Sequence, residues 1–78
     1  MAAKRKINWN KLHEVQTYSA DFANRSVDAT IYSNGGTYHV VKIETIWDNG
    51  HGECETVRCN SRSKAITIAM YNTTNRNY

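Results

Sequence analysis

Two Asn-Gly turns constrain the fold of this chain more than any other feature of its sequence. The segments Asn34-Gly35-Gly36 and Asp48-Asn49-Gly50 separate three runs of alternating apolar and polar residues between Val27 and Cys59. Asn-Gly between alternating runs is a strong hairpin signal, because both residue types accept the positive φ angles that tight turns require. The sequence therefore predicts a three-stranded antiparallel β-meander.

The length of the first turn predicts how its two strands pair. A three-residue loop at 34–36 places the apolar residues of both strands on one face, which is the arrangement that a single core needs. On the opposite face it pairs Tyr32 with Tyr38 and Asp28 with Lys42. An aromatic pair and an ion pair of this kind each stabilise a β-ladder by about 0.2–1 kcal/mol.

The second turn is also expected to contain three residues, 48–50, with Gly50 in the left-handed conformation. An odd number of loop residues keeps Val57 on the same face as Val41 and Ile43. A two-residue Asn-Gly turn would move the whole third strand to the other face, and we therefore disfavour it.

A helix is expected on either side of the meander. Asn8 and Asn10 are both competent N-caps, and the side chains that follow recur at helical spacing, which predicts an amphipathic helix ending near Asn24. These side chains are Leu12, Val15, Tyr18, Ser19 and Phe22. A loose N-terminal segment is the alternative, because Trp9-Asn10 and Gln16-Thr17 weaken the pattern. After Cys59, a cap signal at 60–64 predicts a second helix to about Asn72. A strand is the alternative for this segment, because its isoleucines also alternate with other residues.

The predicted fold is therefore α+β: a three-stranded antiparallel β-meander flanked by an N-terminal and a C-terminal helix. Seventy-eight residues leave room for one small core, and we assign a single domain to residues 8–72. Residues 1–7 are expected to form a disordered basic arm, and residues 73–78 a frayed tail.

The charge of the chain favours polyanionic partners only mildly, since ten Lys and Arg residues stand against seven Asp and Glu residues for a net charge of +3. The cluster Lys4-Arg5-Lys6 precedes no apolar segment typical of a secretory signal, and no window has the length of a membrane span. Cys54 and Cys59 are predicted on opposite faces of one strand, out of disulfide reach, and so as free thiols. We therefore expect a cytoplasmic protein without a membrane partner.

The sequence contains no pattern that indicates catalysis, a cofactor or a metal. His51 and Cys54 form one weak ligand pair, whereas zinc sites usually contain two close pairs. Glu53 and Glu55 share a face of a strand that is expected to be exposed, where carboxylates lack the cleft that acid–base catalysis requires. We expect His39 and Cys59 to lie in the core, His51 to lie on a turn, and the protein not to be an enzyme.

The outer face of the meander is the first candidate site. Tyrosine beside valine and isoleucine on a solvated face is typical of a contact surface, whereas a second helical layer over this face would make the same residues core. The predicted protein-binding residues are Tyr32, Tyr38, Val40, Lys42, Glu44 and Arg58, with Ile46 on the same face.

The alternative candidate site is a set of basic residues at the N-terminal arm and at the start of the last helix. Helix N-termini attract anions through their free amides, so these side chains could contact phosphates, although basic residues at a helix start commonly serve solubility alone. The predicted nucleic-acid-binding residues are Lys4, Arg5, Lys6, Arg62 and Lys64.

Two resemblances extend these expectations. The expected order of helix, three strands and helix, with Ser61-Arg62-Ser63-Lys64-Ala65 and Ala69, resembles the double-stranded-RNA-binding domain at the entry to its second helix. That resemblance implies RNA contacts by Arg62 and Lys64. The composition, with many Asn residues and no Pro in a short chain, is similar to that of small phage accessory proteins, including anti-CRISPR and other anti-defence inhibitors.

These observations together predict a non-enzymatic binding protein. The leading hypothesis is a phage-type inhibitor that docks through its sheet face on a host protein or nucleoprotein complex that processes nucleic acid. The alternative is a module that binds RNA or DNA directly. The sequence does not indicate the oligomeric state.

Overall fold

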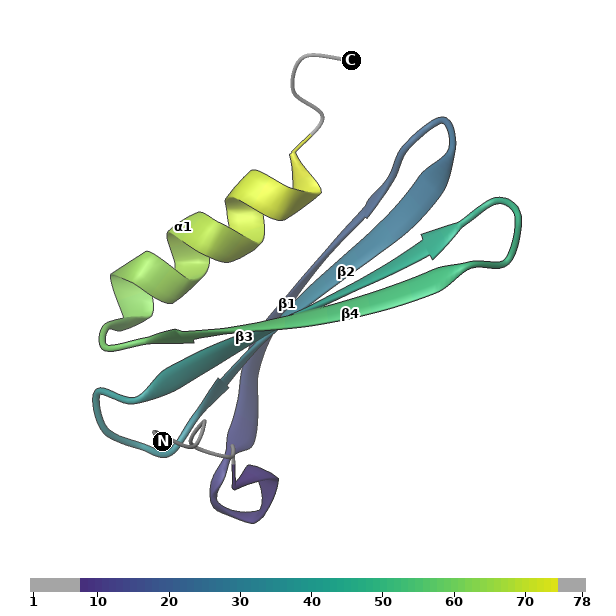
Figure 1. The fold of residues 1–78 in the computed structure, drawn as a ribbon. Helices are drawn as coiled ribbons and strands as arrows, with labels where there is room; N and C mark the ends of the chain where they lie inside the picture. The colour runs from purple at the N-terminus through teal and green to yellow at the C-terminus, as the bar shows by residue number, and fades with distance from the viewer. Residues whose placement is uncertain (1–7, 75–78) are drawn as a thin grey trace, which may run out of the picture.

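The computed structural model describes residues 8–74. These residues form one antiparallel sheet of four strands with a single α-helix packed on one face (Figure 1). A 3₁₀ turn, η1, at Trp9–Lys11 precedes the strands β1 (His13–Asp21), β2 (Arg25–Ser33), β3 (His39–Trp47) and β4 (Gly52–Cys59), and the helix α1 (Arg62–Thr73) follows them. The strands lie in the order β1-β2-β3-β4, so each strand pairs with its neighbours in the sequence.

The predicted N-terminal helix was wrong, because most of that segment forms the strand β1. A β-bulge explains the error: Glu14 pairs with Tyr32 and Gln16 pairs with Ile31, which leaves Val15 as an extra residue. The bulge shifts the alternation by one position, so Val15, Tyr18 and Phe22 all pack against the core at spacings that imitate a helix. Asn8 is an N-cap as expected, but the helical turn that it caps is only the 3₁₀ turn η1, where its side chain accepts a hydrogen bond from the amide of Asn10.

The first predicted hairpin has the correct faces but the wrong register. Ser33 pairs with His39 and Tyr32 with Val40, so the loop covers residues 34–38 and the pairing is displaced by two residues from the prediction. Asn34 N donates to Tyr38 O over 3.3 Å at the base of this loop, and Gly35 takes a φ of 92°. A displacement by two keeps every side chain on its predicted face.

The predicted cross-strand pairs on the outer face fail for the same reason. Tyr32 lies opposite Val40 rather than Tyr38, and Asp28 lies opposite Glu44 rather than Lys42. Two side-chain bonds hold the longer loop: Ser33 Oγ accepts from Gly35 N, and Asn34 Oδ1 accepts from Gly36 N. Local bonds of this type are the reason that Ser and Asn favour turns.

The second hairpin has the predicted register. Trp47 N donates to His51 O over 2.8 Å and closes a three-residue loop, in which Gly50 has a φ of 88°. Val57 pairs with Val41, on the face that also carries Ile43. The left-handed glycine and the odd loop length are both confirmed.

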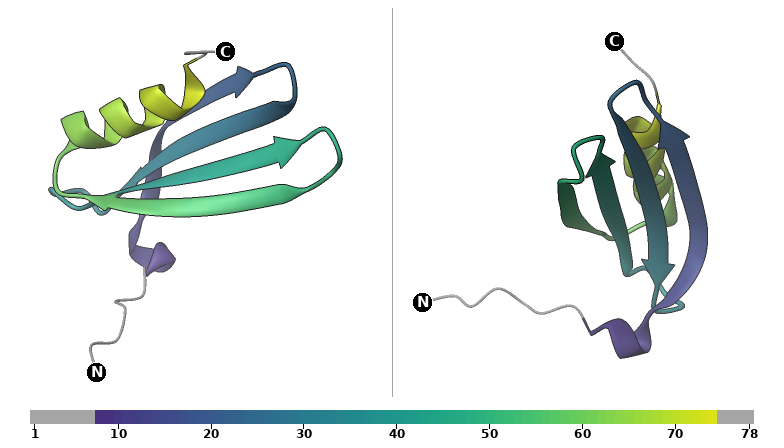
Figure 2. Two further views of the ribbon diagram at one scale, coloured as in Figure 1. Left: turned by 45° about the horizontal axis from the view of Figure 1, so that its top comes forward. Right: turned by 90° about the vertical axis from the view of Figure 1, so that its right-hand side faces the viewer.

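The last segment is a helix, as predicted, and not the alternative strand. Ser61 is its N-cap and accepts a hydrogen bond from Lys64 N over 3.2 Å. Ala65 and Ala69 are fully buried against the sheet, where their small side chains allow the helix to approach closely. Figure 2 shows α1 on one side of the sheet, and among the described residues no α-helix lies on the other. The core between the two layers consists of Val27, Ala29, Ile31, Val41, Ile43, Cys59, Ala65 and Ala69.

Both cysteines lie on β4 as predicted, Cys54 exposed and Cys59 buried, and both are free thiols. Within residues 8–74, no helix has the length and apolar character needed to cross a membrane.

Candidate binding face

The face of the sheet opposite α1 is called the open face here. Strand register places Tyr32 of β2, four alternating residues of β3 and Arg58 of β4 on it, because directly paired residues share a face. The four residues of β3 are Val40, Lys42, Glu44 and Ile46. These were all expected on one face, and among the described residues no helix covers them. Tyr38 belongs to the loop that precedes β3.

One end of the open face carries an aromatic pair that sequence reasoning missed. The rings of Trp9 and Tyr32 meet edge to face, with centroids 5.0 Å apart at 81°, and Lys42 Nζ lies 5.9 Å from the centre of the Trp9 ring. Trp9 is 41% exposed and Tyr32 is half-buried. Sequence reasoning gave Trp9 no binding role; its position directly after Asn8, a competent N-cap, was the available signal of a turn there.

Two of the residues on the open face are buried beneath its surface. Val40 is fully buried, and Thr30, which pairs with Lys42, is 9% exposed. Val40 therefore presents no surface to a partner, and its role is to fill space on the side of the sheet that lacks a helix. Ile46, at the other end of β3, is 55% exposed and is available for contact.

The half of the open face that lies away from Trp9 and Tyr32 is acidic. Asp28 and Glu44 lie directly opposite each other on neighbouring strands, and Asp21 of β1 is on the same face. Like charges that face each other across a ladder destabilise it. Lys42 compensates in part, since its Nζ lies 3.8 Å from Glu44 Oε2. The open face thus has an aromatic end of mixed charge, where Glu14 lies opposite Tyr32 and Lys42 lies near Trp9, and an acidic end.

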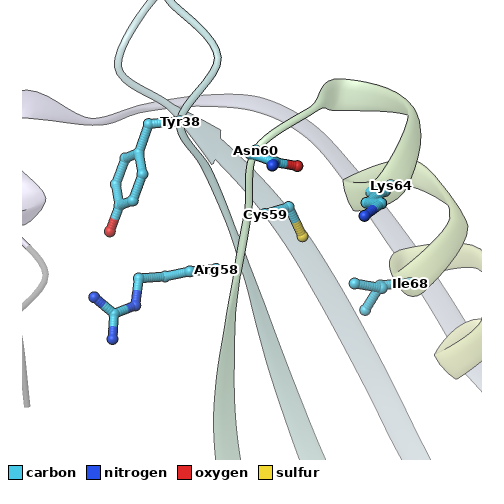
Figure 3. A pocket seen from close by; sticks show the side chains of 6 residues that line it. All are labelled: Tyr38, Arg58, Cys59, Asn60, Lys64 and Ile68. Atoms are coloured by element: carbon cyan, nitrogen blue, oxygen red, sulfur yellow. The ribbon is translucent and has the colours of Figure 1, made fainter.

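Tyr38 and Arg58 line a shallow hollow of about 440 Å³ that continues around the end of β4 to the start of α1 (Figure 3). Tyr38 and Arg58 lie on one side of β4, whereas Cys59, Lys64 and Ile68 lie on the other. Burial raises the pKa of the Cys59 thiol, and the positive charge of Lys64 opposes this shift. Arg58 and Lys64 therefore flank the same end of the edge strand from its two sides.

The alternative nucleic-acid site is only partly within the described residues. Lys4, Arg5 and Lys6 lie outside them. Arg62 and Lys64 are both exposed in the first turn of α1, which contains no acidic residue. Arg62 lines a hollow shared with β1 and the loop between β2 and β3, whereas Lys64 lines the hollow beside β4, so the two cations diverge.

The remaining polar clusters are small and exposed. His51 Nε2 lies 3.4 Å from Glu53 Oε2, and both side chains are exposed. Within residues 8–74, no three His, Cys, Asp or Glu side chains are grouped so that they could hold a metal ion. His39 and Cys59 are buried and His51 lies on a turn, as predicted.

Comparisons with protein-family models, curated proteins and solved structures return no match. The resemblances to the double-stranded-RNA-binding domain and to phage accessory proteins stay predictions. The element order that contributed to the first of them is not the order of this fold, because β1 replaces the expected helix.

Proposed function

We propose that this chain is a non-enzymatic binding protein that docks on a protein partner through its open face. The observation that carries the proposal is the pair of Trp9 and Tyr32 on the face without a helix, flanked by Lys42. Trp, Tyr and Arg are the residues that most often dominate binding energy at protein interfaces. Arg58 and the exposed Ile46 extend the same face on either side.

The charge of the open face supports a protein partner over a nucleic acid. A duplex presents negative charge along its whole length, and Asp28 and Glu44 would repel it from half of this face. A protein surface supplies both signs of charge. This charge distribution favours a protein partner, and the composition of the chain resembles that of phage inhibitors. The proposed partner is therefore a host protein or nucleoprotein complex that processes nucleic acid.

The test is capture from a nuclease-treated bacterial lysate on the immobilised wild-type chain and on two variants with the same change in charge. Arg58→Glu alters the open face, whereas Arg62→Glu alters the start of α1. We expect a partner that is retained by wild type and by Arg62→Glu and lost by Arg58→Glu. Equal retention by all three proteins would contradict docking through this face.

A nucleic-acid-binding module is the second candidate. The observation that favours it is the hollow at the end of β4 that Tyr38, Arg58 and Lys64 all line, beside a helix start that lacks acidic residues. Aromatic rings stack on bases and cations contact phosphates. In a mobility-shift assay with duplex RNA, duplex DNA and single strands, log affinity for duplex DNA should fall against log salt with a slope of about −0.9 per phosphate contact. No shift at low salt would remove this candidate.

A further inference from the structure

The outer edge of β4 is the least protected edge of the sheet. Edge strands expose unpaired backbone groups to any extended segment, and proteins commonly blunt them with a bulge. The other edge, β1, contains a bulge at Val15, whereas β4 pairs with β3 from Gly52 to Cys59 without a register shift. Among the described residues no strand lies beyond β4, and Figure 2 shows its outer side uncovered by α1.

The hydrogen-bond pattern identifies the backbone groups that are free. In an antiparallel pair, hydrogen-bonded and non-bonded residue pairs alternate. The bond from Trp47 N to His51 O sets this alternation for the second hairpin. Glu53, Glu55 and Val57 therefore bond inward to β3. The amides and carbonyls of the intervening residues, Cys54, Thr56 and Arg58, point outward.

We propose that the β4 edge binds an extended segment of a partner protein as a fifth, antiparallel strand, with cationic side chains opposite Glu53 and Glu55. This edge shares Arg58 with the open face, but its binding groups are main-chain atoms together with Glu53 and Glu55, so the proposal does not depend on the function proposed above. The main-chain groups of Cys54, Thr56 and Arg58 would supply the hydrogen bonds, and the side chains would select the segment.

Charge decides which strand fits. Glu53 and Glu55 lie on the face that carries α1, and both are exposed beside a hollow of about 530 Å³ that Ile43, Thr45 and Asn72 also line. That hollow has room for two long cationic side chains. A second copy of this chain is a poorer occupant than a cationic strand. Two-fold pairing centred on Cys54 or Glu55 would oppose glutamates, and pairing centred on Thr56 would place Glu55 opposite Val57 and Glu53 opposite Cys59, where neither glutamate meets a cation. The same charges therefore deter self-association and favour a cationic strand.

The pairing register of an added strand predicts which residue types the partner segment should contain. In an antiparallel fifth strand, residues opposite Arg58, Val57, Glu55 and Glu53 follow one another from the N-terminus of the added segment. An acidic residue suits Arg58, an apolar residue suits the half-buried Val57, and Lys or Arg suits both glutamates. The probe that fits this pattern is the peptide acetyl-Glu-Val-Thr-Lys-Thr-Lys-amide.

The test is a titration of the isotope-labelled full chain with this peptide, in which the chemical shifts of the backbone amides are measured by NMR. We expect saturable shifts concentrated on Cys54, Thr56 and Arg58. A charge-reversed peptide, acetyl-Lys-Val-Thr-Glu-Thr-Glu-amide, should bind at least tenfold more weakly. Absence of shifts, shifts confined to another element, or equal binding of both peptides would overturn the proposal.

Two further arms separate strand addition from simple charge attraction. N-methylation of the two threonine amides of the peptide removes groups that face β4 and should abolish binding, whereas N-methylation of the valine and first lysine amides alters groups that face away and should not. The variant Glu53→Lys with Glu55→Lys should exchange the preference between the two peptides. Indifference to the position of methylation would also overturn the proposal, and this arm requires no change to the protein.

Discussion

Cys54 and Cys59 share one strand but differ in every property that governs thiol chemistry. Cys54 is exposed on the open face, whereas Cys59 is 8% exposed under α1 and burial raises the pKa of its thiol. The thiolate is the reactive form of cysteine. We therefore expect iodoacetamide at neutral pH to label Cys54 in the folded protein and Cys59 only after unfolding, as measured by mass spectrometry of the peptides. Equal labelling rates at the two sites would show that α1 does not protect Cys59.

The same thiol makes stability depend on pH in a defined direction. Because the pKa of Cys59 is raised in the folded state, the neutral thiol is favoured there, and its contribution is present below the ordinary pKa of 9.0. As the pH rises above 9.0, the unfolded state loses its proton first and the contribution declines. The measurement is denaturant unfolding of wild type and Cys59→Ala at neutral and at alkaline pH. The free energy of unfolding should fall less between the two pH values in the variant than in wild type.

Asp28 and Glu44 form an unfavourable pair on the open face. Removal of one charge in Asp28→Asn should raise the free energy of unfolding by about 0.2–1 kcal/mol, which is the range for cross-strand pairs. Salt screens exposed charges, so the gain should shrink between low and high ionic strength. A loss of stability in thermal melts at low salt would mean that Asp28 makes a favourable contact that outweighs the repulsion.

At the scale of elements, the turns illustrate what sequence determines well. Gly50 has a φ of 88° with open space around its Cα, so only backbone strain opposes a side chain there. Gly50→Ala should therefore cost about 1 kcal/mol, whereas Gly36→Ala, at a turn position without positive φ, should cost less. Thermal melts of the two variants test this difference. A larger loss at Gly36 would contradict the assignment of the left-handed position.

The two hairpins also show where sequence reasoning stops. The 48–50 turn was predictable because a single Asn-Gly pair and the parity of Val57 allowed one solution. The 34–38 loop was not, because a displacement of two residues leaves the hydrophobic pattern unchanged. The side chains of Ser33 and Asn34 stabilise the longer loop by hydrogen bonds to its backbone, and the alternation of apolar and polar residues carries no information about such bonds. The strand β1 was not predicted because of the bulge at Val15, since one extra residue changes the alternation of a strand into a spacing that resembles a helix.

The candidate site was partly predictable for a related reason. Parity assigned Tyr32, Lys42, Glu44 and Arg58 to the outer face correctly. It could not show that Val40 on that face is buried. Nor could it show that Trp9 packs on Tyr32, because that contact depends on the path of the chain before β1.

At the scale of the whole molecule, charge and structure are distributed unevenly. Residues 8–74 contain six Lys and Arg residues and seven Asp and Glu residues, so the net positive charge of the chain comes from four basic residues outside them: Lys4, Arg5, Lys6 and Arg76. Arg62 and Lys64 lie in the first turn of α1, which has no acidic residue. Asp28 and Glu44 lie together on the far half of the open face, and Glu53 and Glu55 lie on the first half of β4. A partner of mixed charge therefore matches this molecule better than a uniformly anionic one.

The two tryptophans report on opposite ends of this fold and provide a test of its cooperativity. Trp9 packs on Tyr32 at the aromatic end of the open face, whereas Trp47 lies at the far end of β3, where the Arg25 guanidinium is 5.4 Å from its ring. Every strand and the helix contribute to one core, so no part of residues 8–74 has a core of its own. Small domains of this type usually unfold in a single transition.

Trp47→Phe leaves Trp9 as the sole tryptophan, and Trp9→Phe leaves Trp47. Within each variant, we expect tryptophan fluorescence and far-ultraviolet circular dichroism to give the same midpoint in urea, because both tryptophans pack on a sheet that has a single core. If the Trp9 signal changed at lower urea than the circular dichroism of the same variant, η1 would detach from the open face before the sheet unfolds. Tyr32 would then be transiently uncovered in the native protein, and the docking surface would extend over the whole open face.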